Sequence, residues 1–268
     1  MPEFLLPILI AVGIITAIGL VCSLILVIAS KFFAVKVDEK YTALRDCLPG
    51  ANCGACGYPG CDGYAQALAE DDSIATNLCI PGGAVVAAQL AEIMGVEAQA
   101  TSKKSACVHC NGTCDNTDTK ADYQGIHTCR AAMLTYGGNG LCNYGCLGYG
   151  DCAEACPVDA ISVVDGVARV DINTCIGCGI CAKTCPKGII SMIDSDKQVA
   201  IKCSNKEKGA VARKKCKVAC IGCKKCENTC PSDAITVTDN LAVIDYDKCI
   251  YCGKCAQVCP TGAIKSKK

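Results

Sequence analysis

The sequence predicts an α+β protein in which one N-terminal transmembrane helix precedes several small cysteine-rich domains. Three observations predict this class: an uncharged N-terminal stretch, 28 cysteines among 268 residues, and a duplicated block of short strand-like runs in the second half. Aromatic residues make up only 4% of the chain and Trp is absent. The cores are therefore expected to be small, so that bound metal supplies much of the folding free energy.

The first element is a predicted membrane anchor over residues 1–30. Residues 4–29 carry no charge, and a helix of that length spans about 39 Å, enough to cross a bilayer. The alternative is a signal peptide, which would place Lys or Arg before a shorter apolar run. Here Lys31 and Lys36 follow the run. The positive-inside rule then predicts a single-pass protein of the cytoplasmic membrane, with the amino terminus outside and the rest in the cytoplasm.

A charged linker is expected over residues 31–46, followed by a four-cysteine domain over residues 47–96. Cys53, Cys56 and Cys61 form C-x2-C-x4-C, with Cys79 further on and glycines between them. Glycine lets the backbone wrap tightly, so that amide groups can point at sulfur. We expect a [4Fe–4S] cluster here, with a structural zinc site as the alternative. Helices are predicted over residues 62–72 and 83–94.

Residues 97–130 are expected to form an additional cysteine region. It begins with a linker over residues 97–106. Its cysteines are Cys107, Cys110, Cys114 and Cys129. They could together hold a further [4Fe–4S] cluster. The two histidines of the chain, His109 and His127, lie in this region and are expected to be spacer or surface residues and not ligands. The alternative is that Cys129 has another role, because its counterpart in the repeat described below, Cys203, has no cysteine triplet before it.

Three later runs follow the strict pattern C-x2-C-x2-C-x3-C-P, beginning at Cys175, Cys220 and Cys249. This pattern is typical of bacterial ferredoxins that hold [4Fe–4S] clusters through thiolates. A disulfide framework would lack such runs, and zinc ribbons use pairs of C-x2-C. Clusters of this kind require a reducing compartment, which agrees with cytoplasmic cysteine domains.

The second half is an internal repeat with an offset of 74 residues. It predicts two tandem ferredoxin-like modules over residues 131–198 and 199–268, each with two [4Fe–4S] clusters and a hairpin between its cluster loops. One position breaks the match, since Tyr149 stands where the second copy has Cys223. Cys142 is the expected replacement ligand.

In two-cluster ferredoxins the fourth cysteine of each run ligates the other cluster. The predicted ligand sets are Cys142, Cys146, Cys152 with Cys185; Cys175, Cys178, Cys181 with Cys156; Cys220, Cys223, Cys226 with Cys259; and Cys249, Cys252, Cys255 with Cys230. The total is about six [4Fe–4S] clusters. The cysteines without an assignment are Cys22, Cys47, Cys203 and Cys216.

The sequence contains neither a G-x-G-x-x-G motif after a strand nor a Walker loop. It therefore predicts a carrier of single electrons with no catalytic residue of its own, because hydride chemistry needs a two-electron cofactor. The formal net charge of +0 gives no indication of nucleic-acid binding. One helix cannot form an ion path, so any translocation belongs to partner subunits.

The anchor, the segment LPGANCGACGYPGC with the distal Cys79, and the tandem ferredoxin runs resemble the RnfB family of Rnf complexes, in its longer form. The resemblance implies a component of an ion-translocating ferredoxin–NAD oxidoreductase that accepts electrons from reduced ferredoxin. It implies membrane-embedded and flavin-bearing partner subunits, and export of Na⁺ or H⁺ by the complex. The alternative functions are an iron–sulfur subunit of another membrane redox complex, such as a hydrogenase or quinol-linked reductase, and a zinc-storage or structural zinc protein.

Overall fold

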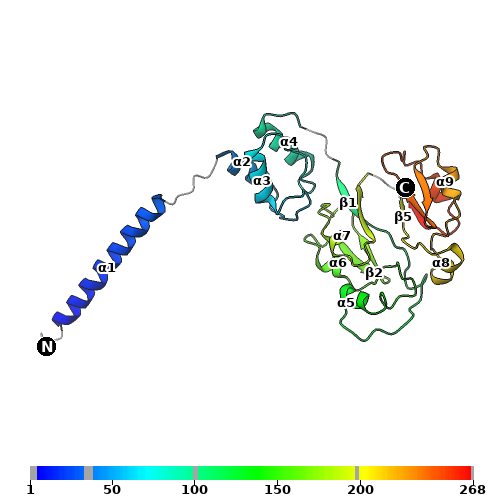
Figure 1. Cartoon of the computed structure of the whole chain (residues 1–268), viewed down its shortest axis with the longest axis horizontal. Coiled ribbons are helices and arrows are strands. Elements are labelled where there is room, and N and C mark those ends of the chain that lie inside the picture. The colour runs from blue at the N-terminus through cyan, green and yellow to red at the C-terminus, as the bar shows by residue number, and fades with distance from the viewer. Residues whose placement is uncertain (1–4, 33–38, 99–101, 197–198, 267–268) are drawn as a thin grey trace. The chain divides into compact units, whose positions relative to one another are not determined.

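A computed structural model describes residues 5–32, 39–98, 102–196 and 199–266. The chain divides into two units, residues 1–42 and 43–268. The first unit is dominated by helix α1 (Leu5–Phe32; Figure 1). Its window Val12–Ser30 is long and apolar enough to cross a membrane.

The side chains of α1 suit a lipid environment. Its apolar side chains from Val12 to Ile28 are exposed within the protein, and a bilayer would cover such a surface. The hydroxyl groups of Thr16, Ser23 and Ser30 each donate to a carbonyl one turn earlier, at 2.9 Å in each case. These bonds leave no hydroxyl proton unsatisfied in a setting without water. The predicted helix is confirmed, and Phe4 lies outside the described residues.

Helices α2 (Glu39–Cys47), α3 (Cys61–Glu70) and α4 (Gly83–Met94) build the four-cysteine part of the chain. The two helices predicted here are α3 and α4. The predicted linker is in part helical, because α2 buries Leu44 and is followed by the buried Leu48; residues 33–38 of that linker lie outside the described residues. Gly95 ends α4 in a left-handed conformation, φ 67°, which glycine adopts without strain.

The next part of the chain contains two antiparallel strand pairs and three short helices. Strand β1 pairs with β4, and β2 pairs with β3 in a hairpin. Asp165 and Gly166 occupy the hairpin turn with φ values of 49° and 77°, as a type I′ turn requires. The elements in order are β1 (Lys104–Val108), α5 (Cys129–Leu134), α6 (Asp151–Glu154), β2 (Ile161–Val164), β3 (Val167–Val170), α7 (Ile180–Thr184) and β4 (Ile190–Asp194).

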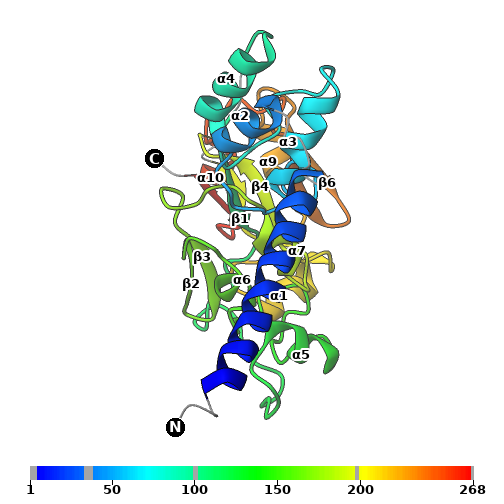
Figure 2. The same cartoon turned by 90° about the vertical axis from the view of Figure 1, so that its left-hand side faces the viewer.

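The last part repeats this arrangement. Strand β5 pairs with β8, and β6 pairs with β7 across a turn at Asp239 and Asn240. Figure 2 shows β2 beside β3 and β1 beside β4 in the preceding copy. The elements in order are β5 (Val199–Ile201), α8 (Gly209–Lys215), α9 (Lys225–Thr229), β6 (Ile235–Thr238), β7 (Leu241–Ile244), α10 (Lys254–Gln257) and β8 (Ile264–Ser266).

The strand register corrects one pairing of the sequence repeat. Val108 lies opposite Ile190, and Ile201 lies opposite Ile264. Ile190 and Ile264 are counterparts at the 74-residue offset, so Ile201 is the counterpart of Val108. Two residues further on, Cys203 is therefore the counterpart of Cys110, and not of Cys129 as the constant offset indicated. The physical reason is an insertion after β1 in the first copy, which contains α5.

Candidate metal centres

The four cysteines of residues 47–96 come together around the start of α3. Cys61 begins this helix, and its N–H donates to Asn52 Oδ1 at 2.9 Å. Burial raises the pKa of the Cys79 thiol, and the nearby thiols of Cys61, Cys56 and Cys53 raise it further. The structure thus joins the four predicted ligands of this domain into one set. Thiols gathered away from water need a cation to become thiolates, as iron would provide.

The first ferredoxin-like run acquires Cys129 in place of the missing ligand. Burial raises the pKa of Cys152 to about 12, and Cys146, Cys129 and Cys185 are the first of the neighbouring thiols that add to this. The Tyr149 backbone N–H donates toward the Cys129 sulfur. The structure therefore groups Cys129, and not Cys142, with Cys146, Cys152 and Cys185. The sequence prediction differed because Cys142 is nearer in sequence.

The Tyr149 side chain takes part in an aromatic cluster. Its ring centroid lies 5.7 Å from those of both Tyr123 and His127. His127 was expected to be a spacer or surface residue, and its ring packs here beside the inserted segment that delivers Cys129. The position of the predicted ligand Cys223 in the second copy thus holds a packing residue in the first.

Asp151 fixes the position of Cys129. Its carboxylate accepts the backbone N–H of Cys129 at 2.7 Å and that of Arg130 at 3.0 Å. The Thr128 hydroxyl accepts from Ala131 N at 3.1 Å and caps the same helix. Because Asp151 directly precedes Cys152, one residue couples the inserted helix α5 to the cysteine run.

Neighbouring thiols also occur within the other three predicted sets. Burial raises the pKa of Cys181 to about 11, with Cys178, Cys175 and Cys156 adding to it. Burial likewise raises the pKa of Cys226 to about 11, and the nearby Cys220 and Cys223 raise it further. Cys259 lines the same cavity as Cys220, Cys223 and Cys226. Cys255 has Cys249 and Cys252 as neighbours, and Cys230 is the repeat counterpart of Cys156.

Backbone N–H groups point at sulfur at matching positions of the two copies. Ala160 N lies 3.3 Å from Cys156 Sγ, and Ala234 N lies 3.3 Å from Cys230 Sγ. Cys146 N lies 3.4 Å from Cys110 Sγ, and Cys220 N lies 3.3 Å from Cys203 Sγ. Such hydrogen bonds stabilise ligating thiolates and are one determinant of cluster potential. The sulfur environments therefore suit iron–sulfur clusters.

The set predicted from Cys107, Cys110, Cys114 and Cys129 is not formed. Cys107 lies on β1 and its Sγ accepts from Lys202 Nζ at 3.2 Å. Cys114 is exposed, and its N–H donates to Asp165 O at 3.0 Å. Cys110 lies instead near Cys142 and Cys203. The C-x2-C-x3-C spacing predicted a shared site, but Cys107 belongs to a strand, where side chains alternate between faces.

Sequence reasoning left out Cys203 and Cys216, which the structure brings to Cys110 and Cys142. The equivalence of Cys203 and Cys110 could have been found by aligning the strands instead of applying one offset. His109, expected to be a spacer or surface residue, is largely buried. Its Nδ1 contacts Ile201 O at 2.7 Å and its Nε2 contacts Ser191 Oγ at 2.6 Å. It links the two copies, and among the described residues it belongs to no group of three ligand side chains that could hold a single metal ion.

Gathered thiols, amide groups directed at sulfur and paired small hairpins together define an iron–sulfur protein with an apolar helix long enough to span a membrane. Family comparisons agree with this class. Two models described as a 4Fe-4S dicluster domain match residues 174–235 and 219–263, and one described as a putative Fe-S cluster matches residues 48–81.

Curated relatives define the family more closely. The chain is 46% identical to the B component of the Na(+)-translocating ferredoxin:NAD(+) oxidoreductase complex of Acetobacterium woodii, over 90% of this chain and 72% of that protein. It is 44% identical to the B component of the proton-translocating ferredoxin:NAD(+) oxidoreductase complex of Clostridium ljungdahlii, over 87% of this chain and 82% of that protein. It is 37% identical to the B component of the ion-translocating oxidoreductase complex of Methanosarcina acetivorans, over 89% of this chain and 90% of that protein. The chain belongs to this family, the RnfB family that its sequence resembles.

Proposed function

We propose that this chain is the membrane-anchored component that accepts electrons from reduced ferredoxin and passes them into a complex that reduces NAD and exports Na⁺ or H⁺. The observation that carries the proposal is the combination, in one chain, of a membrane-length helix with repeated four-cysteine sets. Relatives whose names describe ferredoxin:NAD(+) oxidoreductase complexes support the assignment of donor and acceptor.

Five ligand sets combine the neighbouring cysteines described above with the repeat, which supplies Cys230, the counterpart of Cys156, to the last set. When bound, a [4Fe–4S] cluster supplies one-electron transfer. The chain's part is to hold the sulfur atoms, donate N–H groups to them and exclude water. The sets are Cys53, Cys56, Cys61, Cys79; Cys129, Cys146, Cys152, Cys185; Cys156, Cys175, Cys178, Cys181; Cys220, Cys223, Cys226, Cys259; and Cys230, Cys249, Cys252, Cys255.

We further propose two tandem two-cluster modules after the four-cysteine domain. The common strand pairing of the two copies supports this division. The first module includes β1, because that strand pairs with β4, so it begins before residue 131. The basic residues after α1 support an orientation with the amino terminus outside and all cysteine sets in the cytoplasm.

NAD reduction then belongs to a flavin-bearing partner, and ion movement to membrane-embedded partners. The sequence offers no dinucleotide-binding motif, and single-electron carriers do not transfer hydride. The lipid bilayer anchors the chain beside these partners through α1.

The test uses the whole chain, reconstituted anaerobically with iron and sulfide. Reduced ferredoxin should bleach its visible absorption, while NAD added to the reduced chain alone should yield no NADH. Adding the chain to membranes that lack it should restore ferredoxin-dependent NADH formation. Failure of ferredoxin to reduce the loaded chain would favour a hydrogenase or quinol-linked complex, and NADH formation by the chain alone would contradict the division of labour.

A further inference from the structure

Four cysteines from distant parts of the sequence line one cavity between the two ferredoxin-like copies. Cys110 follows β1 and Cys203 follows β5, at equivalent positions of the repeat. Cys142 lies four residues before Cys146 in the first copy, and Cys216, its counterpart at the 74-residue offset, directly follows α8. All four line the same cavity. None of the five sets proposed above uses any of them.

Two glycines keep the cavity open. A side chain on Gly112 would place its Cβ 3.4 Å from Cys216 Sγ and 3.7 Å from Cys110 Sγ. These two sulfur atoms therefore lie on either side of the same small space. A side chain on Gly145 would come within 3.8 Å of Cys142 Sγ. Residues with side chains at these positions would occupy space next to three of the four sulfur atoms.

Backbone bonds between the copies hold Cys110 and Cys216 in place. Thr117 forms a β-bridge with Cys216, and its hydroxyl donates to Lys215 O at 2.8 Å. Lys217 N donates to Asn116 O at 2.8 Å. The segment after Cys110 is thus paired with the chain around Cys216, so the contact between the copies is built into the fold.

Amide groups surround the sulfur atoms of the cavity. Gly112 N and Cys146 N each lie 3.4 Å from Cys110 Sγ. Asn205 N and Cys220 N lie 3.5 and 3.3 Å from Cys203 Sγ. The same two-donor arrangement occurs at both equivalent cysteines. Thiolates in iron–sulfur sites accept hydrogen bonds of this kind.

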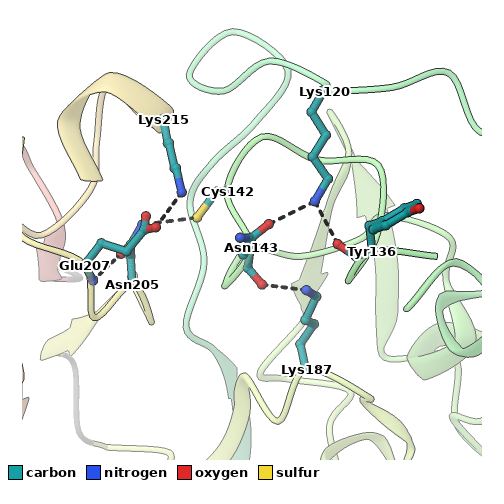
Figure 3. Close-up of polar contacts among 8 residues, drawn as sticks. All are labelled: Lys120, Tyr136, Cys142, Asn143, Lys187, Asn205, Glu207 and Lys215. Atoms are coloured by element: carbon teal, nitrogen blue, oxygen red, sulfur yellow. Dashed lines mark hydrogen bonds and ion pairs between the residues drawn. The ribbon is translucent and has the colours of Figure 1, made fainter. Parts of the chain in front are cut away.

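A fully buried polar side chain also points into the cavity. Asn205 is 0% exposed, and its Nδ2 lies 3.5 Å from Cys142 Sγ. The same amide donates to Glu207 Oε2 at 3.3 Å and its Oδ1 accepts from Glu207 N at 2.7 Å. Glu207 is paired in turn with Lys215 (Figure 3), the residue that precedes Cys216 in the sequence. Glu207 thus satisfies one N–H of the buried amide, and the other is directed at the Cys142 sulfur, as a donor beside a ligating thiolate would be.

The thiols of this cavity are poorly solvated. Cys110 and Cys216 are each 7% exposed. Cys142 and Cys203 are half-buried. Neither a carboxylate nor an imidazole lines the cavity among the described residues. Four thiols in such a place become thiolates only when a bound cation supplies the compensating charge.

We propose that Cys110, Cys142, Cys203 and Cys216 ligate a further [4Fe–4S] cluster that joins the two ferredoxin-like copies, with Asn205 as its positioning residue. The inference rests on the proposed iron–sulfur function. Loading replaces four S–H bonds by four S–Fe bonds and releases four protons to solvent. The [4Fe–4S]²⁺ core forms from two Fe²⁺, two Fe³⁺ and four sulfide ions, all supplied in the reconstitution mixture, so the iron needs no further oxidation or reduction.

The test compares iron and acid-labile sulfide in full-length chains reconstituted anaerobically. The wild type should hold about 24 iron atoms, four for each of six sites. Cys216→Ala should lose about four, or show a three-iron EPR signal, and Cys203→Ala should do the same. The double variant should lose no more than either single variant, because the two residues serve one cluster. The matched controls are Cys107→Ala, buried nearby but outside the cavity, and Cys114→Ala; both should keep the wild-type content.

A second variant leaves every cysteine in place. Gly112→Val should fill the space beside Cys110 and Cys216 and remove the same four iron atoms, while every cysteine of the other sets is retained. If Cys216→Ala and Gly112→Val both retained wild-type iron, or if the cavity held zinc or a disulfide, the inference would be wrong. A wild type with about 20 iron atoms would also overturn it while leaving the proposed function intact. A chain that binds no iron would instead overturn the proposed function.

Discussion

Replacement of Asp151 by Ala tests how the first copy acquires Cys129. The Asp151 carboxylate accepts two backbone N–H groups at the start of α5, from Cys129 at 2.7 Å and Arg130 at 3.0 Å. The substitution removes both acceptors and leaves the Thr128 cap in place. It should therefore loosen the helix start without removing any ligand.

The magnitude follows from the exposure of the two donors. A hydrogen bond to a charged group contributes about 1.5–3 kcal/mol. Arg130 is exposed, so water can replace the lost acceptor there, whereas Cys129 is 8% exposed and its N–H has less access to water. We expect a local destabilisation of about 2 kcal/mol, almost all from Cys129. Since 1.4 kcal/mol is a factor of ten, local opening should become roughly 30-fold more frequent.

The assay is anaerobic amide hydrogen exchange on the reconstituted chain, read out at residues 129 and 130. Exchange there should accelerate roughly 30-fold in Asp151→Ala, and a chelator should remove iron faster from one cluster in six. Asp151→Asn keeps one acceptor oxygen and should show a smaller effect. The matched control is Glu154→Ala on the same helix, since Glu154 makes no side-chain hydrogen bond within the described part of the chain. Equal exchange in Asp151→Ala and Glu154→Ala would refute the anchoring role.

Three further outcomes follow from the same contacts. Cys129→Ala should lose about four iron atoms, whereas Cys114→Ala should lose none by iron analysis; equal losses would contradict the observed grouping. Deleting residues 1–30 should give a chain that no longer sediments with membranes and keeps its full iron content, and a large loss of iron would show that the anchor supports the sites. Gly148→Ala should lower the thermal midpoint by several degrees, because its φ is 76° and an added Cβ would lie 2.7 Å from Gly166 O. Gly188→Ala, at φ 60° with nothing within 4 Å, should cost only about 1 kcal/mol, and similar midpoints for the two would contradict the steric argument.

Much of the fold could be predicted because its signals are local. The uncharged run predicted α1, and the Asp165–Gly166 turn predicted the first hairpin. The strict cysteine runs predicted which thiols close in sequence lie near one another. The errors arise where a ligand comes from far away. Spacing favoured Cys142 over Cys129 at the Tyr149 position, but the Asp151 carboxylate brings Cys129 there.

The second error concerns residues that the prediction left unassigned. Cys203 and Cys216 lack a cysteine run of their own, so neither spacing nor motif indicates a partner for them. Their neighbours are set by strand pairing and by the bridge between Thr117 and Cys216. Contacts between two copies of a repeat depend on how the copies pack, and a one-dimensional offset contains no information about packing.

The formal net charge of +0 does not describe the chain with its clusters bound. Each cluster with four thiolates carries roughly −2, so six would add roughly −12. Lys187 Nζ donates to the carbonyl of Asn143, and Lys120 Nζ donates to Asn143 Oδ1 at 2.9 Å (Figure 3). Lys187 Nζ also donates to the carbonyl of Gly137. Burial and the charge of Lys120 lower the pKa of Lys187, while nearby Cys142 acts in the opposite direction. Two mutually repelling cations thus fix the loop that carries Cys142. Thiolate charge beside them offsets that repulsion, so cluster loading and ordering of the inserted segment should stabilise each other.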